Sequence, residues 1–489
     1  MNDYGFGNYI RDLRDEKGYS QFQLGKLVGV SDKAVSKWEN GAAKPRLGTC
    51  MRLAAVLEVP PTDFLQGLKI HPVTSKESPM ENKISTAKAI LKTAEEKLGK
   101  EYGPQVPAAF LCRFETENLA LANSEMPLHY EFLHRIRELS NALGKTILVR
   151  GTTASSYIAW LLGATEVNPA PPHLYCEHCK KVVFLPDLRD GWDAVSATCS
   201  CGSVMSGDGH GIPFDEYGTS LNESGIHLDI EIAPSLLPEA EELLLSYYAG
   251  WYSPTLVDFG ETSTVSRKYL LLGPDEACID SEQGRMVSRE DAFRKYAAVP
   301  SINFICLPVN ETALTVSPNV DCHPVTPERL QKAYEKLYSV MEAAGGEDED
   351  QHRAFSEIAA ESKKYPLSFS LLMRMELLLH SPSCWMKNGD KLVKEGTVSL
   401  LNLPVCREDV LEMFYQSELL IGDNGRGIAL KYVRAVRRGH FALGKEQVNG
   451  ALLLELGMPE WLPDYFRKIT YLFPKAHEVE MMIKTLRNV

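Results

Sequence analysis

The stretch SQFQLGKLVGVSDKAVSKWENG at residues 20–41 carries the start and stop signals of two short helices. Ser20 precedes the first run as a helix N-cap, and Gly29 ends that run. Ser31 caps a second helix, which Gly41 ends. Two short helices joined by a tight glycine turn are typical of a helix-turn-helix unit.

Apolar residues in and beyond this stretch recur at helical spacing, which predicts that they form one small core. These residues are Leu24, Leu27, Val35, Trp38, Leu53 and Leu57.

The residues outside that core are short or basic hydrogen-bonding groups at the amino end and along one flank of the second helix. That end of a recognition helix enters the major groove of DNA. We therefore expect the DNA-binding residues to be Gln21, Ser31, Asp32, Lys33, Ser36, Lys37 and Asn40.

Residues 7–66 resemble the Cro/C1 (XRE-like) helix-turn-helix family, through the pattern S-Q-x-x-L, then G-V-S, then V-S-x-W-E-x-G, then P. The resemblance implies that Gln21 and Asn40 contact phosphates, whereas Asp32, Lys33 and Lys37 face base edges of double-stranded DNA. At position 32 the family usually has a neutral or basic residue, whereas this chain has an aspartate. Its carboxylate can accept a hydrogen bond from a cytosine amino group. These domains usually bind as dimers, which implies a homodimer. A helical protein-binding domain without DNA is the alternative.

The whole chain has 489 residues, which suggests roughly three domains. Its 52 basic and 65 acidic residues give a net charge of −13, so a uniformly basic coat for nucleic acid is excluded. The first 18 residues carry charges where a signal peptide needs an apolar stretch, and no apolar run reaches the ~18 residues of a membrane span. We expect a cytoplasmic protein without membrane contact, whose 11 cysteines are buried thiols or metal ligands.

The pattern along the chain predicts an α+β protein that is mostly helical. We expect a five-helix helix-turn-helix domain at 1–70, a polar linker at 71–82, an α/β region at 83–341 and a helical domain at 352–489.

Four cysteines in two pairs predict a structural zinc site at 176–201. Cys176 and Cys179 form a C-x-x-C pair, and Cys199 and Cys201 form a tighter C-x-C pair. Tetrahedral zinc takes four such thiolates, and a closed shell leaves no position for catalysis. His178 is an alternative ligand, and four reduced structural cysteines are the alternative to a metal site.

Small hydroxyl residues follow a basic residue in RGTTASS at 150–156, just before an apolar helix. Amide groups at a helix start favour an anion, and an arginine adds charge. This pattern predicts a phosphate cradle formed by Arg150, Gly151, Ser155 and Ser156. A simple helix start is the alternative.

Several segments in order resemble the palm and fingers of the PolC-type bacterial DNA polymerase III alpha subunit, over about half the chain. They are RGTTASSYIAWLLGATEVNPAPPHLYCEHC (150–179), DGHGIPFDEYG (208–218), HLDIEIAPS (227–235), SFSLLMRMELLLHSPSCWMKNGDKLVKEGT (368–397) and MPEWLPDYFRKITYLFPKAH (458–477). The resemblance implies a reduced palm-like region with a zinc knuckle at 83–341 and a fingers-like domain at 352–489.

The resemblance also places the paired catalytic acids of the polymerase at Asp229 and Glu231. Acids two apart on a strand share one face and can hold Mg²⁺. Three departures weaken the catalytic interpretation. Glutamate replaces aspartate at 231, Ala154 replaces a glycine of the phosphate loop, and the motif that carries the family's third carboxylate has no counterpart between 236 and 351. We therefore expect a module that has lost catalysis.

Basic residues without acids run from 426 to 445 and predict a phosphate-binding helix face. Arg434, Arg437 and Arg438 lie three and four apart on it, and a solvated basic helix is the alternative. The preferred hypothesis is a bacterial DNA-binding regulator of transcription fused to a degenerate polymerase module. The alternatives are an active nucleotidyltransferase using Asp229, Glu231 and Mg²⁺, and a module that contacts replication proteins.

Overall fold

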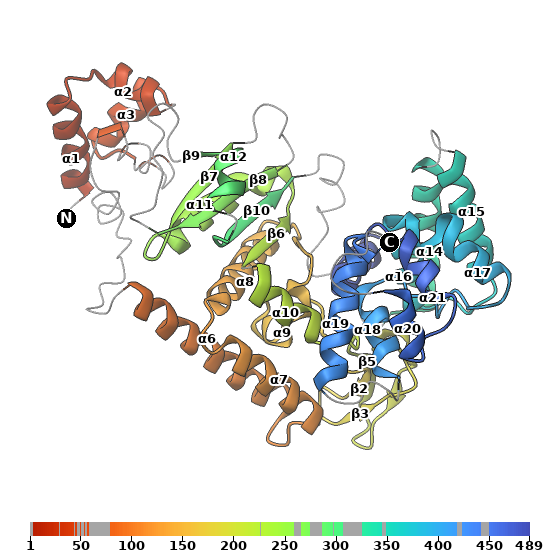
Figure 1. Cartoon of the computed structure of the whole chain (residues 1–489). Helices are drawn as coiled ribbons and strands as arrows, with labels where there is room; N and C mark the ends of the chain where they lie inside the picture. The colour runs from red at the N-terminus through yellow and green to blue at the C-terminus, as the bar shows by residue number, and fades with distance from the viewer. Residues whose placement is uncertain are drawn as a thin grey trace. The chain divides into compact units, whose positions relative to one another are not determined.

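The structure is a computed structural model of the chain (Figure 1). It describes residues 3–28, 30–43, 45, 49, 53, 56–57, 79–224, 226–258, 266–273, 286–296, 298–306, 325–344, 349–417, 423–441 and 449–489. Contacts divide the chain into two units. The first comprises Met1–Thr86 and Ile232–Pro308, and the second comprises Ala87–Glu231 and Val309–Val489.

The N-terminal helices are α1 (Asp3–Glu16), α2 (Gln21–Val28) and α3 (Asp32–Glu39). They enclose a core of Ile10, Leu24, Val28, Val35, Trp38, Leu53 and Leu57. The core prediction is correct except for Leu27, which is 52% exposed on the outer side of α2.

Helices α2 and α3 meet through a close turn. A Cβ atom on Gly25 would lie 2.8 Å from the carbonyl oxygen of Val30, so the helix needs a glycine there. The predicted stop at Gly29, most of the predicted fourth and fifth helices, and residues 71–78 of the predicted linker lie outside the described residues. Residues 79–82 of that linker are the first residues of a helix.

The remainder of the first unit is an antiparallel sheet with helices. Its strands run in the order β10–β8–β7–β9, and β9 is parallel to β7. Its elements are α11 (Leu237–Tyr248), β7 (Ser253–Asp258), β8 (Ser266–Leu272), β9 (Met286–Ser288), α12 (Arg289–Arg294) and β10 (Ser301–Ile305).

The second unit starts with helices and leads into a small sheet. Helix α6 (Pro79–Tyr102) runs into this unit. The four-stranded sheet has the order β3–β2–β5–β4, and β1 pairs with β6 in antiparallel fashion. The elements are α7 (Ala108–Leu121), α8 (Met126–Ala142), β1 (Leu148–Arg150), η1 (Thr153–Ser155), α9 (Tyr157–Leu162), β2 (His173–Tyr175), β3 (Val182–Phe184), η2 (Gly191–Asp193), β4 (Ala197–Thr198), β5 (Val204–Asp208), α10 (Asp215–Ser224) and β6 (His227–Glu231).

Its C-terminal part is helical around an extensive apolar core, whose largest buried side chains include Trp385, Tyr432 and Tyr465. The helices are α14 (Pro327–Ala344), α15 (Glu349–Ser362), α16 (Phe369–His380), α17 (Asp390–Lys394), α18 (Arg407–Tyr415), α19 (Asp423–Arg437), α20 (Gly450–Glu455), α21 (Leu462–Lys468) and α22 (Lys475–Arg487).

The fold is thus α+β and mostly helical, as the sequence predicts. In the ranges given above, every helix falls short of the length or the apolar content that crossing a membrane requires.

Candidate nucleic-acid and metal sites

Helix α3 begins where the sequence predicts a recognition helix. Ser31 has extended backbone angles (φ −77°, ψ 154°), and its hydroxyl accepts a hydrogen bond from the amide of Ala34 at 3.3 Å. This cap starts the helix at Asp32. Ser31, Asp32, Lys33, Lys37 and Asn40 are exposed, which leaves the amino end and one flank of α3 open to a ligand.

A buried ion pair holds α3 against the first two helices. The Glu39 carboxylate accepts hydrogen bonds from Arg14 Nε at 2.6 Å and from Gln21 Nε2 at 2.8 Å. Burial raises the pKa of Glu39, but the bonds from Arg14 and Gln21 lower it by more, so it lies below the usual value. All three N-terminal helices are therefore tied to one carboxylate.

Two predicted phosphate contacts take part in this local network. The side-chain amide of Gln21 donates one hydrogen bond to the Glu39 carboxylate. Asn40 donates to Ser36 Oγ at 3.4 Å and accepts from Arg11 at 3.1 Å. Ser36 is partly buried, which places it behind the exposed residues of α3.

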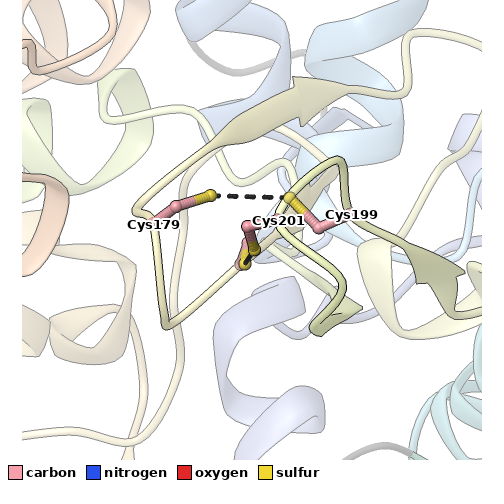
Figure 2. Close-up of side chains that lie close together, drawn as sticks. Cys179, Cys199 and Cys201 are labelled. Atoms are coloured by element: carbon pink, nitrogen blue, oxygen red, sulfur yellow. Dashed lines mark hydrogen bonds between the residues drawn. The ribbon is translucent and has the colours of Figure 1, made fainter.

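The four predicted cysteines come together in the second unit, as Figure 2 shows for three of them. Sγ atoms lie 3.6 Å apart between Cys176 and Cys201, and 3.5 Å apart between Cys179 and Cys199. Ligands ~2.3 Å from a tetrahedral zinc ion are separated by about 3.8 Å, so the residues fit that ion. His178 is exposed and is not part of this set.

Two tight turns present these thiols. Lys180 adopts a left-handed conformation (φ 61°), and its amide bonds the Cys176 carbonyl at 2.8 Å. Gly202 (φ 87°) forms the second turn in the same way, since its amide bonds the Cys199 carbonyl at 2.9 Å. Hydrogen bonds from Ser203 lower the pKa of Cys201 to about 5, which favours its thiolate. A backbone bond from Lys181 lowers the pKa of Cys179, but the neighbouring thiols raise it by more.

In the predicted phosphate cradle, a side chain of the protein already occupies the amides at the start of α9. The buried Glu117 carboxylate accepts bonds from Ser156 Oγ at 2.7 Å and from the amides of Tyr157 and Ile158 at 2.9 and 3.2 Å. Ser155 is 2% exposed. The acidic cap takes the amides of α9 that a phosphate would need, so Arg150 and Gly151 are the cradle residues that remain accessible.

The two predicted catalytic acids differ in their surroundings. Asp229 is exposed on β6, opposite Arg150 on β1. Glu231 is 1% exposed and bonds Lys484 Nζ at 3.2 Å, with Arg150 at 3.9 Å. Helix α22 packs against β1, which places Lys484 there. The carboxylate that the resemblance assigns to a metal ion therefore faces two cationic side chains.

The predicted basic face on α19 needs a correction. Arg437 is 4% exposed, and its guanidinium pairs with the buried Glu216, which also bonds Arg407 at 2.9 Å. Arg438 is exposed just beyond the end of α19, and Arg434 is partly buried. Arg437 is therefore a core ion-pair residue, because spacing alone did not show which side of α19 packs inward.

A cavity of about 550 Å³ lies among the motif residues of the second unit, including Pro169, Pro171 and Pro172. Two of its charged groups bond to other parts of the protein. Lys475 bonds the carbonyl of Arg189 at 3.1 Å, and Asp409 bonds Arg374 at 3.1 Å. Lys475 and Arg374, which belong to the polymerase-like segments, therefore hold neighbouring parts of the second unit together.

One cluster was missed by the sequence reasoning. Glu376, His380 and Glu478 offer ligand atoms that all lie within 4.8 Å of one another. The E-x-x-x-H spacing on α16 could have indicated the first two, because residues four apart share a helix face. The third comes from α22, which only the tertiary structure brings close.

Comparison with known proteins agrees with both resemblances. Residues 10–64 match a family model described as helix-turn-helix. The chain is also similar to DNA polymerase III PolC-type from Streptococcus agalactiae serotype III (strain NEM316), 23% identical over 457 residues, with 79% of this chain and 30% of that protein covered.

Two further relatives have the same description. The Streptococcus thermophilus (strain LMD-9) protein is 23% identical over 452 residues, with 79% of this chain and 30% of the relative covered. The Ureaplasma parvum serovar 3 protein is 25% identical over 450 residues, with 77% and 30% covered. The chain thus spans about 30% of the length of these relatives and has a helix-turn-helix match at its N-terminus.

Proposed function

We propose that this chain is a bacterial, cytoplasmic, sequence-specific DNA-binding protein in which a helix-turn-helix domain is fused to a PolC-like module without catalytic activity. The observation that carries the first half is the exposed amino end of α3, held on a small core by the Arg14–Glu39 pair. A rigid helix with exposed polar side chains can enter a major groove at little entropic cost.

In this proposal Lys33, Lys37 and Asp32 read base edges. The two lysines donate to guanine acceptors, and the Asp32 carboxylate accepts from a cytosine amino group. Ser31, Gln21 and Asn40 lie beside them and meet phosphates, which set the register of the domain.

The proposal that the PolC-like module has no catalytic activity rests on the environment of Glu231. Its carboxylate bonds Lys484 and lies near Arg150, in the position where the resemblance expects a Mg²⁺ ligand. A metal ion there would have to displace the ammonium group of Lys484, whose side chain is 11% exposed. The residues present do not suit Mg²⁺, and we assign the module a binding and regulatory role.

Zinc is proposed as a structural ion of the Cys176, Cys179, Cys199 and Cys201 cluster. Four thiolates fill its coordination shell, so the ion would fix two chain turns and take no part in chemistry.

The similarity to PolC-type polymerases favours a second candidate, an active nucleotidyltransferase that uses Asp229, Glu231 and Mg²⁺. It also favours a third, in which the module contacts replication proteins. Both candidates use the polymerase-like region, whereas our proposal places the main function in the first three helices.

Selection of binding sites from random duplexes tests the first half of the proposal. We expect enrichment of a short motif by the full-length protein, and no enrichment would contradict sequence-specific binding. Lys33→Ala should reduce enrichment of the motif.

Primer extension with Mg²⁺ or Mn²⁺ tests the second half. We expect no incorporation by the native chain or by Asp229→Ala. Incorporation that Asp229→Ala abolishes, and that the exposed-site control Glu177→Ala retains, would establish the polymerase candidate. Capture of replication proteins after nuclease treatment would favour the third.

A further inference from the structure

A second metal-capable cluster lies where two helices of the second unit pack together. Glu376 and His380 are in the last turns of α16, and Glu478 is in the first turn of α22. His380 Nδ1 lies 2.9 and 3.2 Å from the two carboxylate oxygens of Glu478. The sulfur cluster uses none of these residues.

One oxygen of this cluster lacks a partner. Glu376 is 7% exposed, and its Oε2 atom is buried without a hydrogen-bond partner among the described residues. Burial, and then the nearby Glu478 charge, raise the pKa of Glu376 to about 8. A buried carboxyl oxygen without a partner is costly, and it points to a ligand that supplies one.

We propose that Glu376, His380 and Glu478 bind a divalent first-row transition-metal ion, separately from the cysteine cluster.

The ligand types select the class of ion. Carboxylate oxygens suit hard cations, and an imidazole nitrogen shifts the preference from Mg²⁺ or Ca²⁺ toward Mn²⁺, Fe²⁺ or Zn²⁺. Ligands ~2.1 Å from such an ion lie about 3 Å apart when they are adjacent. His380 and Glu478 are at this separation in their own ion pair, so the ion would replace the proton that they share.

The surroundings leave a path to the site. The His380 side chain is 36% exposed, whereas the Glu478 side chain is fully buried. An ion would therefore enter from the side of His380, where water can complete its coordination shell. The nearby ammonium of Lys484 bonds Glu231 at 3.2 Å. The positive charges of Lys484 and of Lys336 on α14 lower the pKa of Glu376, so an ion would bind near two cationic side chains.

Mn²⁺ titration of the zinc-loaded, full-length protein, followed by electron paramagnetic resonance, tests the proposal. Mn²⁺ competes poorly for thiolates, so the cysteine cluster stays silent. We expect one site per chain, and at least about tenfold weaker binding in Glu376→Gln and in His380→Gln, because each loses a direct ligand.

The matched control is Glu138→Gln. It changes another histidine–glutamate pair at four-residue spacing, His134 and Glu138 on α8, whose nitrogen and oxygen lie 3.6 Å apart. Glu138 is not in either metal-capable set of the described chain, so its variant should bind Mn²⁺ like the native protein.

Three results would overturn the proposal. They are no Mn²⁺ binding by the native chain at millimolar concentration, equal binding by Glu376→Gln, His380→Gln and the native chain, or loss of binding in Asp229→Asn alone. The last would place the ion at the palm-like acids. Glutamine matches the shape of a protonated Glu376, so this variant should fold, which a metal-free thermal melt checks.

Discussion

At the residue scale, the positions on α3 divide sharply by their surroundings. Lys33 and Lys37 are exposed, while the Glu39 carboxylate is fully buried against Arg14. The exposed residues can be changed without disturbing the core, so their effect on DNA binding can be measured separately from stability. A change at Glu39 would instead alter the stability of the domain, because its carboxylate is buried in an ion pair with Arg14.

Substitution of Lys33 by alanine should weaken binding to the selected site by about 1–3 kcal/mol if the ammonium meets a base. Fluorescence anisotropy on the selected duplex and on random DNA measures the two affinities. The control is Lys26→Ala, on the exposed side of α2. Equal losses on both duplexes would move Lys33 from base contact to phosphate contact.

Glu39→Gln should destabilise the helix-turn-helix domain by about 3 kcal/mol, because Arg14 loses its buried counter-charge and keeps only the exposed one of Asp15. Thermal unfolding of the full chain, compared between the native protein and the variant, measures the loss. Asp15→Asn is the control, since Asp15 pairs with the same arginine but is 60% exposed. A control loss as large as that of Glu39→Gln would contradict the buried-pair argument.

The same pair predicts a pH dependence. The pKa of Glu39 in the folded chain lies below its unfolded value of about 4.3. Its stabilising contribution is therefore complete above the unfolded pKa, and it is lost as the pH falls through the folded pKa. Melting curves between pH 3 and 7 should show the native chain and Glu39→Gln converging in acid, and a constant difference would contradict this assignment.

At the scale of elements, short turns and helix ends determine which groups remain available for ligands. In the turns at Lys180 and Gly202, the amide of each residue bonds the carbonyl of the first cysteine of its pair. These turns bring the four thiols together. The start of α9 is closed by Glu117, which occupies the amides an anion would use. The cysteine turns thus leave their thiols available for a ligand, whereas the start of α9 is occupied by a side chain of the protein itself.

Metal analysis should find about one zinc per chain bound by the cysteine cluster. Cys179→Ser should lower that content and the melting temperature, because a structural metal contributes directly to folding. Cys112→Ser is the matched control, since it replaces another exposed free cysteine on α7. Zinc content unchanged by Cys179→Ser, or a native protein without metal, would end the zinc proposal.

At the scale of the whole molecule, the chain combines a helix-turn-helix match with similarity to about 30% of a PolC-type polymerase. The net charge of −13 opposes nonspecific association with DNA, so binding has to concentrate on local surfaces such as α3. One recognition helix buries only a small surface, which limits the affinity of a single chain.

We therefore expect two chains on each selected site. Sedimentation of the full-length protein with a selected duplex measures the stoichiometry. A duplex with one half-site altered should bind more weakly, because the second chain loses its base contacts. A complex with a single chain at saturating protein would contradict the homodimer.

Much of this architecture could be predicted from the sequence, because the signals are local. The cap at Ser31, the apolar spacing from Leu24 to Trp38 and the paired cysteines each depend on neighbours in the chain. Side-chain period and turn chemistry fix such features before any long-range contact forms.

The tertiary structure alone decided which charges are buried and what they meet. Arg437 pairs with Glu216, Glu231 with Lys484, and Glu478 approaches His380 across 98 residues of chain. A helix's spacing shows which residues share a face, but the partner of that face is set by packing between distant segments. Whether an acid or an arginine serves as a ligand site or as part of the core therefore depends on long-range contacts.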